Sequence, residues 1–289
     1  MSRHKLAGAL GILSLSVSPV AAQVSFQTAD ATGSGMGVTS RNASAIAVYD
    51  FNADGALDLL VVNKNTDELA VLLNDGDGMF TFSQSIALGR NPTSIAVGEL
   101  NGDATPDVAV AIIGDDAVTV LPGASGGGLG APTTFTVGDS PLHVAMGDLD
   151  DQNGVDLVTC NEPDDTISIL LNNGDGTFAD ATDIDVSIND GGNARSEPNG
   201  SAIGDFNGDG NLDIAVALAA RDQVGILLGN GDGTFGELTP VDVGRDPHRI
   251  ATGDFDGDGN LDLAVANTTA DSISILLGDG SGAYMEDLV

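Results

Sequence analysis

The stretch Asp50-Phe-Asn-Ala-Asp-Gly-Ala-Leu-Asp58 occurs in five variant copies along this chain of 289 residues. The copies begin at Asp50, Glu99, Asp148, Asp205 and Asp254, so successive copies are 49, 49, 57 and 49 residues apart. Acidic or amide side chains at loop positions 1, 3, 5 and 9 direct oxygens toward one centre, as in sites for hard cations such as Ca²⁺. A period of about 50 residues indicates a repeat architecture.

The loop differs from an EF-hand, which needs a glutamate at position 12 and a helix on each side. Position 12 here is valine or threonine: Val61, Val110, Thr159, Val216 and Val265. Short apolar runs such as Ala45–Val48 and Leu59–Val62 flank the loop, and such runs are typical of buried strands. The pattern therefore predicts a metal-stapled β-hairpin in each copy.

A second motif follows each loop, and its last, aromatic position lies 30 residues after the start of the loop. Its four clear copies are Asn74–Phe80, Asn172–Phe178, Gly229–Phe235 and Gly278–Tyr284, and Leu129 holds the aromatic place in the second repeat. Asn-Gly and Asp-Gly pairs supply the positive φ angles of a tight hairpin turn. We expect a turn followed by a core anchor, with a second metal site as the alternative.

Together the two motifs resemble the FG-GAP/VCBS repeats, the calcium-bearing blades of integrin-α-type β-propellers. The resemblance implies up to five Ca²⁺ ions, held by side chains at positions 1, 3, 5 and 9 and by the backbone carbonyl at position 7. The implied ligands are Asp50, Asn52, Asp54, Asp58, Glu99, Asn101, Asp103, Asp107, Asp148, Asp150, Gln152, Asp156, Asp205, Asn207, Asp209, Asp213, Asp254, Asp256, Asp258 and Asp262.

The five loops differ in their ligands. The fifth carries aspartate at all four positions, whereas the first and fourth replace one with Asn52 or Asn207. The second has Ala104 where glycine is usual, and the third has Gln152 at position 5. Fewer charges and a poorer turn weaken cation binding. We therefore expect the fifth loop to bind best and the second and third to bind least well.

The expected fold is all-β: a β-propeller of four-stranded blades. Integrin propellers have seven blades, whereas this chain has five repeats. The fifth repeat lacks an obvious fourth strand, while Val24–Thr28 has the pattern of a surplus outer strand. We therefore expect five blades closed by this N-terminal strand, since closure removes exposed sheet edges. The alternative is an incomplete ring that a partner completes.

Residues 1–22 resemble a secretory signal peptide, with Arg3 and Lys5 before an apolar stretch and a cleavage site near Ala22. A membrane anchor is the alternative. The propeller then occupies residues 23–289, and the expected location is secreted, periplasmic or on the cell surface. The single cysteine, Cys160, excludes an intramolecular disulfide and is expected to be buried.

The formal charge of −34 disfavours nucleic acid and anionic lipid as partners, because phosphate binding needs clustered lysine and arginine. No segment after the leader is apolar enough to span a membrane. The metal hairpins and glycine-rich turns should share one face, leaving the cations on the other. The candidate ligand-binding residues there are Arg90, His143, Arg245, His248 and Arg249. The alternative is that acidic ligands fill the metal face and exclude cations from it.

No catalytic motif is present: there is no Gly-x-Ser-x-Gly, no His-Glu-x-x-His and no phosphate loop. We therefore expect a non-enzymatic adhesion or binding module with structural Ca²⁺ and a protein or carbohydrate ligand on the cation-bearing face. The absence of tryptophan weakens the carbohydrate version. The alternatives are a polysaccharide-active lyase or hydrolase on a propeller scaffold and a purely structural surface protein.

Overall fold

The computed structural model describes residues 42–188 and 195–287. Within these ranges the chain forms five antiparallel sheets of four strands each, together with one two-stranded ribbon. Two short 3₁₀ turns, η1 (Ile113–Asp115) and η2 (Ala219–Arg221), complete the described elements. None of the described helices is long and apolar enough to cross a membrane.

Each sheet is named here by its order in the chain. The first contains β1 (Ala43–Tyr49), β2 (Asp58–Asn63), β3 (Glu68–Asn74) and β4 (Phe80–Ala87). The second contains β5 (Pro92–Gly98), β6 (Asp107–Ile112), β7 (Ala117–Leu121) and β10 (Thr133–Thr136), with the ribbon β8 (Gly123–Ala124) and β9 (Gly128–Leu129) between the last two. The third contains β11 (Pro141–Gly147), β12 (Asp156–Asn161), β13 (Thr166–Leu170) and β14 (Thr182–Asp185).

The fourth sheet contains β15 (Pro198–Gly204), β16 (Asp213–Leu218), β17 (Gln223–Leu227) and β18 (Thr239–Asp242). The fifth contains β19 (Pro247–Gly253), β20 (Asp262–Asn267), β21 (Ser272–Gly278) and β22 (Tyr284–Asp287). In all five sheets the strands lie in chain order from the inner to the outer edge. This confirms the predicted all-β, four-stranded repeat.

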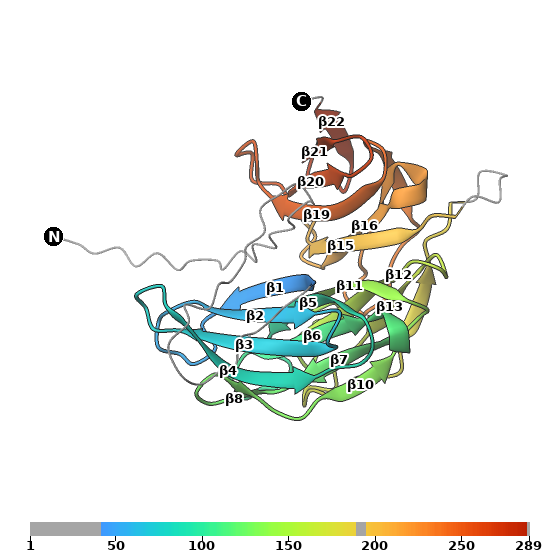
Figure 1. Ribbon diagram of the computed structural model, residues 1–289. Helices are drawn as coiled ribbons and strands as arrows, with labels where there is room; N and C mark the ends of the chain where they lie inside the picture. Colours follow the sequence, from blue (N-terminus) through green and yellow to red (C-terminus); the bar gives the residue numbers. More distant parts are fainter. Residues whose placement is uncertain (1–41, 189–194, 288–289) are drawn as a thin grey trace.

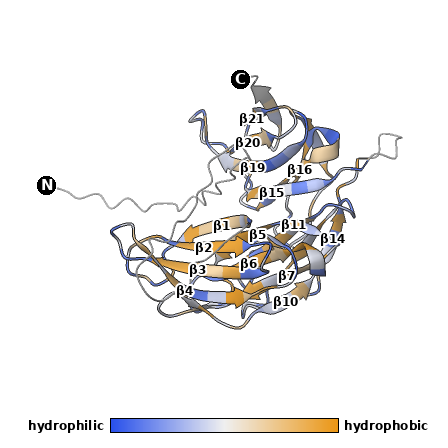
Figure 2. Cartoon of the chain, viewed as in Figure 1, coloured by the Kyte–Doolittle hydropathy of each residue, from blue (hydrophilic) through white to orange (hydrophobic). Residues whose placement is uncertain are grey.

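The sheets pack face to face, and their inner strands β1, β5, β11, β15 and β19 follow one another around the molecule (Figure 1). Strands β6, β12 and β16 are buried at all six positions, because a sheet lies on each side of them. After the initial aspartate, β6 and β16 are entirely apolar, whereas β12 also buries Thr159 and Asn161. Figure 2 shows this concentration of hydrophobic residues on the strands.

Four hydrophobic clusters hold the array together, one between each pair of successive sheets. Among the described residues no such cluster joins the fifth sheet to the first. Ile46 and Val48 on β1 and Ile273 on β21 are correspondingly exposed. The predicted closed five-bladed ring therefore stays a prediction.

The prediction that the fifth sheet lacks a fourth strand of its own is wrong. Strand β22 pairs with β21 through Tyr284↔Gly278 and Met285↔Leu277, so the chain's C-terminal segment fills the outer position. The chain beyond Tyr284 is short, but four residues suffice for an outer strand here, as in β14 and β18. The segment Val24–Thr28, which we expected at this position, lies outside the described residues.

The turn between the second and third strands connects each sheet to the next. It places an aspartate in the left-handed region, and that carboxylate accepts a hydrogen bond from the backbone where the next inner strand begins. The contacts are Asn91 N to Asp67 (2.8 Å), Ser140 N to Asp116 (2.9 Å), Ser196 N to Asp165 (2.8 Å) and Asp246 N to Asp222 (3.0 Å). Aspartate tolerates this backbone conformation better than most residues.

The aromatic anchors that follow the glycine-rich turns pack against the preceding sheet. Phe178 lies in the cluster between the second and third sheets, and Tyr284 contacts Phe206 edge-on with ring centroids 6.1 Å apart. The expectation fails at Phe80, which is 41% exposed. The first sheet has no predecessor among the described residues, so its anchor has nothing to cover it.

Candidate metal centre

Each acidic loop closes a hairpin between the first and second strands of its sheet, as predicted. The last residue of the inner strand pairs with the aspartate at loop position 9, for example Gly147 with Asp156 and Gly253 with Asp262. All five position-9 aspartates are buried: Asp58, Asp107, Asp156, Asp213 and Asp262.

Both oxygens of every position-9 carboxylate accept backbone hydrogen bonds. In the third loop Asp156 Oδ2 accepts from Leu149 N (2.7 Å), and Oδ1 accepts from Asn172 N (2.8 Å) in the glycine-rich turn. The same pair of contacts recurs in the other four loops. The position-9 aspartate thus ties the loop to the turn beside it, a role that sequence reasoning missed when it treated this residue only as a metal ligand.

The side chains at positions 1, 3 and 5 fold inward over the loop backbone. In the fifth loop Asp254 accepts from Gly257 N (2.7 Å) and Gly259 N (3.1 Å), and Asp256 accepts from Asp258 N (3.0 Å). The first, second and fourth loops repeat this curl. The second does so with Ala104 at a φ of 65°, in the left-handed region where glycine was expected. This backbone conformation is costly for alanine.

Carboxylates converge to metal-binding distance in two of the five loops. Asp148, Asp150 and Asp156 place ligand oxygens within 4.8 Å of one another, and Asp254, Asp256 and Asp262 do the same. Asp258, at position 5 of the fifth loop, does not belong to that cluster. Such groups of carboxylate oxygens could hold a hard divalent cation.

Of the two carboxylate clusters, the one in the third loop has the greater need of a counter-charge. Asp148 Oδ1 is buried and has no hydrogen-bond partner. Burial raises the pKa of Asp156 to about 6, and the negative charges of Asp150 and Asp148 add to that rise. Buried like charges are costly unless a counter-charge compensates them. The donor set and the orphaned oxygen both fit a bound cation in this loop.

The ranking of the loops by cation affinity stays a prediction. Three carboxylates gather in the fifth loop, which is expected to bind best, and also in the third, which is ranked among the weakest because of Gln152. In the first and fourth loops the amide of Asn52 or Asn207 donates to Asp54 (2.8 Å) or Asp209 (3.0 Å). The N–H group of the position-3 amide is thus hydrogen-bonded to the carboxylate at position 5.

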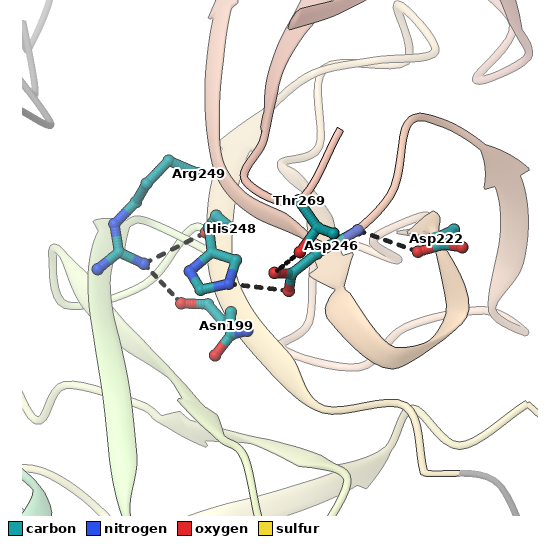
Figure 3. A network of polar contacts seen from close by, with 6 residues as sticks. All are labelled: Asn199, Asp222, Asp246, His248, Arg249 and Thr269. Carbon is teal, nitrogen blue, oxygen red and sulfur yellow. Dashed lines mark hydrogen bonds and ion pairs between the residues drawn. The ribbon is translucent and has the colours of Figure 1, made fainter. Parts of the chain in front are cut away.

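The five candidate ligand-binding residues occupy different environments. Arg90 forms an ion pair with Asp115, at 2.8 Å between Nε and Oδ1, and Arg245 is exposed. His248 lies 3.0 Å from Asp246, which also accepts from Thr269 Oγ1 (2.7 Å), as Figure 3 shows. His143 and Arg249 lie on the inner strands β11 and β19, and both contact β15 of the fourth sheet: His143 at Ser201 and Arg249 at Asn199 O.

The comparisons with known proteins agree with this fold. Solved structures that are similar include a lectin from Agrocybe aegerita that recognises non-reducing terminal N-acetylglucosamine (TM-score 0.59, 20% identity, 86% of this chain and 67% of the lectin). A putative 6-phosphogluconolactonase from Bacteroides fragilis matches with a TM-score of 0.62 at 15% identity, over 85% of this chain and 77% of the other. Virginiamycin B lyase from Staphylococcus aureus matches with a TM-score of 0.57 at 14% identity, over 86% and 71%.

No curated protein matches the chain. Likenesses at such low identity establish the propeller fold alone. The FG-GAP-like repeat family matches residues 50–110, 151–216 and 205–265, which together span more than half of the sequence and contain four of the five acidic loops whole and most of the other, the third. The chain therefore belongs to the FG-GAP-like repeat family and has a β-propeller fold.

Proposed function

We propose that the chain is a secreted, calcium-stabilised propeller module that binds a protein or carbohydrate ligand, with the metal in a structural role. The observation that carries the metal part is the orphaned, buried Asp148 Oδ1 within a cluster of three carboxylates. Calcium suits such a loop better than magnesium, because Ca²⁺ accepts irregular coordination by six to eight oxygens. Residues 1–22, the proposed export signal, lie outside the described residues.

Asp148, Asp150 and Asp156 would hold the ion in the third loop, and Asp254, Asp256 and Asp262 in the fifth. The ion would neutralise carboxylates that the fold already gathers. The third and fourth loops are also held against the next sheet: Gly233 N donates to Leu149 O (3.1 Å), and Gly282 N donates to Phe206 O (3.1 Å). A cation in the third loop would therefore stabilise its contact with the fourth sheet.

The ligand-binding part of the proposal rests on the cation-bearing face. Inner strands run from that face toward the metal loops, so residues at strand starts, such as His143 and Arg249, lie at the end remote from the metal. Recognition of a sugar by the Agrocybe lectin makes carbohydrate one candidate class on this fold. A catalytic role and a purely structural role remain the alternatives.

The metal is tested by titrating the chelated full-length chain with Ca²⁺ while measuring the melting temperature. We expect the melting temperature to rise, since a ligand at 100 times its Kd stabilises the folded state by about 2.7 kcal/mol per site. Asp150→Asn and Asp256→Asn should each reduce the number of bound ions measured by calorimetry. Glu237→Gln, an equal charge change at an exposed residue outside the loops, is the matched control.

Identical melting temperatures with Ca²⁺ and with EDTA would refute the structural metal. A glycan array and a pull-down with the calcium-loaded protein then separate carbohydrate from protein ligands. Turnover of an acidic polysaccharide would instead favour the enzyme.

A further inference from the structure

The inner strands of the third, fourth and fifth sheets carry three different residues at one structurally equivalent position. His143, Gly200 and Arg249 each follow two residues after the proline that begins the strand, and each faces the second strand just past a register shift. Because successive inner strands pack together, these positions lie around one region of the molecule. It is at the strand ends remote from the acidic loops.

Arg249 brings a positive charge that no carboxylate of the described chain neutralises. Its Nη1 donates to the backbone oxygens of Asn199 (2.7 Å) and His248 (3.2 Å), and its side chain is turned away from the His248–Asp246 pair (Figure 3). Among the described residues it forms no ion pair, although the sequence contains 43 acidic residues. Burial lowers the pKa of Arg249. A desolvated guanidinium normally has an anionic partner.

Cys160 does not supply that partner. Burial raises the pKa of its thiol to about 12, so the sulfur stays neutral. Carbonyl oxygens satisfy only one end of the guanidinium, and its Nε and Nη2 make no hydrogen bond within the described chain. These two N–H groups form the planar edge that suits an oxyanion.

His143 adds a neutral donor. Its Nδ1 accepts from the backbone N–H of Ser201 (3.2 Å), so the ring proton of the neutral imidazole lies on Nε2. Burial and the nearby Arg249 lower the pKa of His143 to about 3, which keeps the ring neutral at ordinary pH. No hydrogen-bond partner is found for Nε2–H among the described residues.

Gly200 makes the close approach of the strands possible. A Cβ at this position would lie 2.3 Å from His248 O and 3.3 Å from Arg249 Nη1. Any larger residue would push β19 and the guanidinium away from β15. The fold thus keeps a glycine where the arginine crosses from the fifth sheet toward the third and fourth.

We propose that the guanidinium of Arg249 and the Nε2–H of His143 bind an oxyanion group, a carboxylate or a sulfate, of the ligand. The inference rests on the proposed ligand-binding function and adds the chemistry that the ligand must carry. An uncharged Nε2–H and a planar N–H edge favour a compact group with several oxygens over chloride.

The test uses the calcium-loaded full-length chain, with sodium sulfate and sodium galacturonate as separate probes against sodium chloride at constant ionic strength. Binding is followed by NMR through the Ser201 amide and the arginine side-chain signals. We expect saturable shifts with at least one probe, and the stronger probe identifies sulfate or carboxylate as the preferred group. Arg249→Gln should weaken that binding about tenfold or more.

Arg90→Gln is the control, because Arg90 is already paired with Asp115. Should Arg249→Gln fail to fold, Arg249→Lys keeps the charge but loses the planar fork, and should lose selectivity over chloride. Absence of saturable binding in the wild type, or unchanged binding in the folded Arg249 variants, would overturn the site. Calcium-dependent melting and neutral-glycan binding are measured on the same samples, so the proposed function can survive a failure of the anion site.

Discussion

The third and fifth repeats carry the same loop in two different surroundings. The third lies between neighbouring sheets, and its position-2 residue Leu149 is 1% exposed, whereas Phe255 at the same place in the fifth is 50% exposed. Gly233 N of the fourth sheet donates to Leu149 O across the interface, and among the described residues no following sheet covers the fifth loop. The place of a repeat in the array therefore decides how deeply its loop is buried.

The same difference extends to the carboxylates. Asp148 and Asp150 are half-buried, whereas Asp254 and Asp256 are exposed. Water can solvate the charges of the fifth loop, but the third loop has less access to solvent. How strongly a loop is stabilised by a cation therefore depends on the burial of its carboxylates as well as on their number.

The largest expected effect is on the free energy of unfolding, when Leu149 and Phe255, the two position-2 residues, are replaced by alanine. Leu149→Ala should lower the free energy of unfolding by about 2–5 kcal/mol, because it leaves a cavity between the third and fourth sheets. Phe255→Ala, at a half-exposed site, should cost about 1 kcal/mol or less. Urea denaturation of both variants at saturating Ca²⁺ measures the difference, and equal losses would break the comparison.

The next effect concerns Asp156 in the calcium-free protein. Its pKa of about 6 in the folded state lies above the ordinary value of 3.8, so its charge destabilises the folded state above pH 6. That penalty, up to about 3 kcal/mol, disappears as the pH falls from 6 toward 3.8. In EDTA the wild type should therefore gain stability relative to Asp156→Asn as the pH falls from 7 to 4.

Measuring that difference in free energy of unfolding, rather than the wild type alone, cancels His143, whose contribution has the opposite sign. A difference that stays constant with pH would show that Asp156 titrates in the folded state as it does in the unfolded chain.

The smallest effect is spectroscopic. The lowered pKa of His143, about 3, means that its ring stays neutral when unfolded histidine, at about 6.5, becomes protonated. Its contribution to stability is present above pH 6.5 and is lost as the pH falls toward 3. NMR of the folded protein should show no His143 titration between pH 5 and 8. His248→Gln assigns the ring signals, and a midpoint for His143 near 6.5 would contradict its burial.

Much of the fold follows from the sequence, because its signals are local. Aspartate and glycine spacing predicted the hairpins, and apolar runs predicted the strands on either side. What failed depends on neighbours along the array: Phe80 has no preceding sheet, and β22 fills a position that pattern reasoning left empty. The sequence of a single repeat does not show whether another repeat packs against it.

The candidate site divides in the same way. The ligand positions in the acidic loops were predicted from spacing, but the burial that orphans Asp148 Oδ1 was not. His143 and Arg249 were identified only as cations or near-cations on one face. Their shared surroundings depend on Ser201, Asn199 and Gly200, which carry no recognisable motif. Comparing the third residue of successive inner strands is the signal that could have found them.

The contact of each glycine-rich turn with the loop of the preceding sheet has a consequence for how the molecule comes apart. Each unit is held by its nearest neighbours, as in other repeat proteins. If the loops bind ions as proposed, loss of an ion from an internal loop would loosen two units at once. Loss from the fifth loop, which no following sheet covers among the described residues, would loosen only the last unit. Under limited proteolysis after partial chelation, we therefore expect cleavage to begin in the C-terminal repeat and to proceed inward, with a ladder of fragments that would record the order of ion loss.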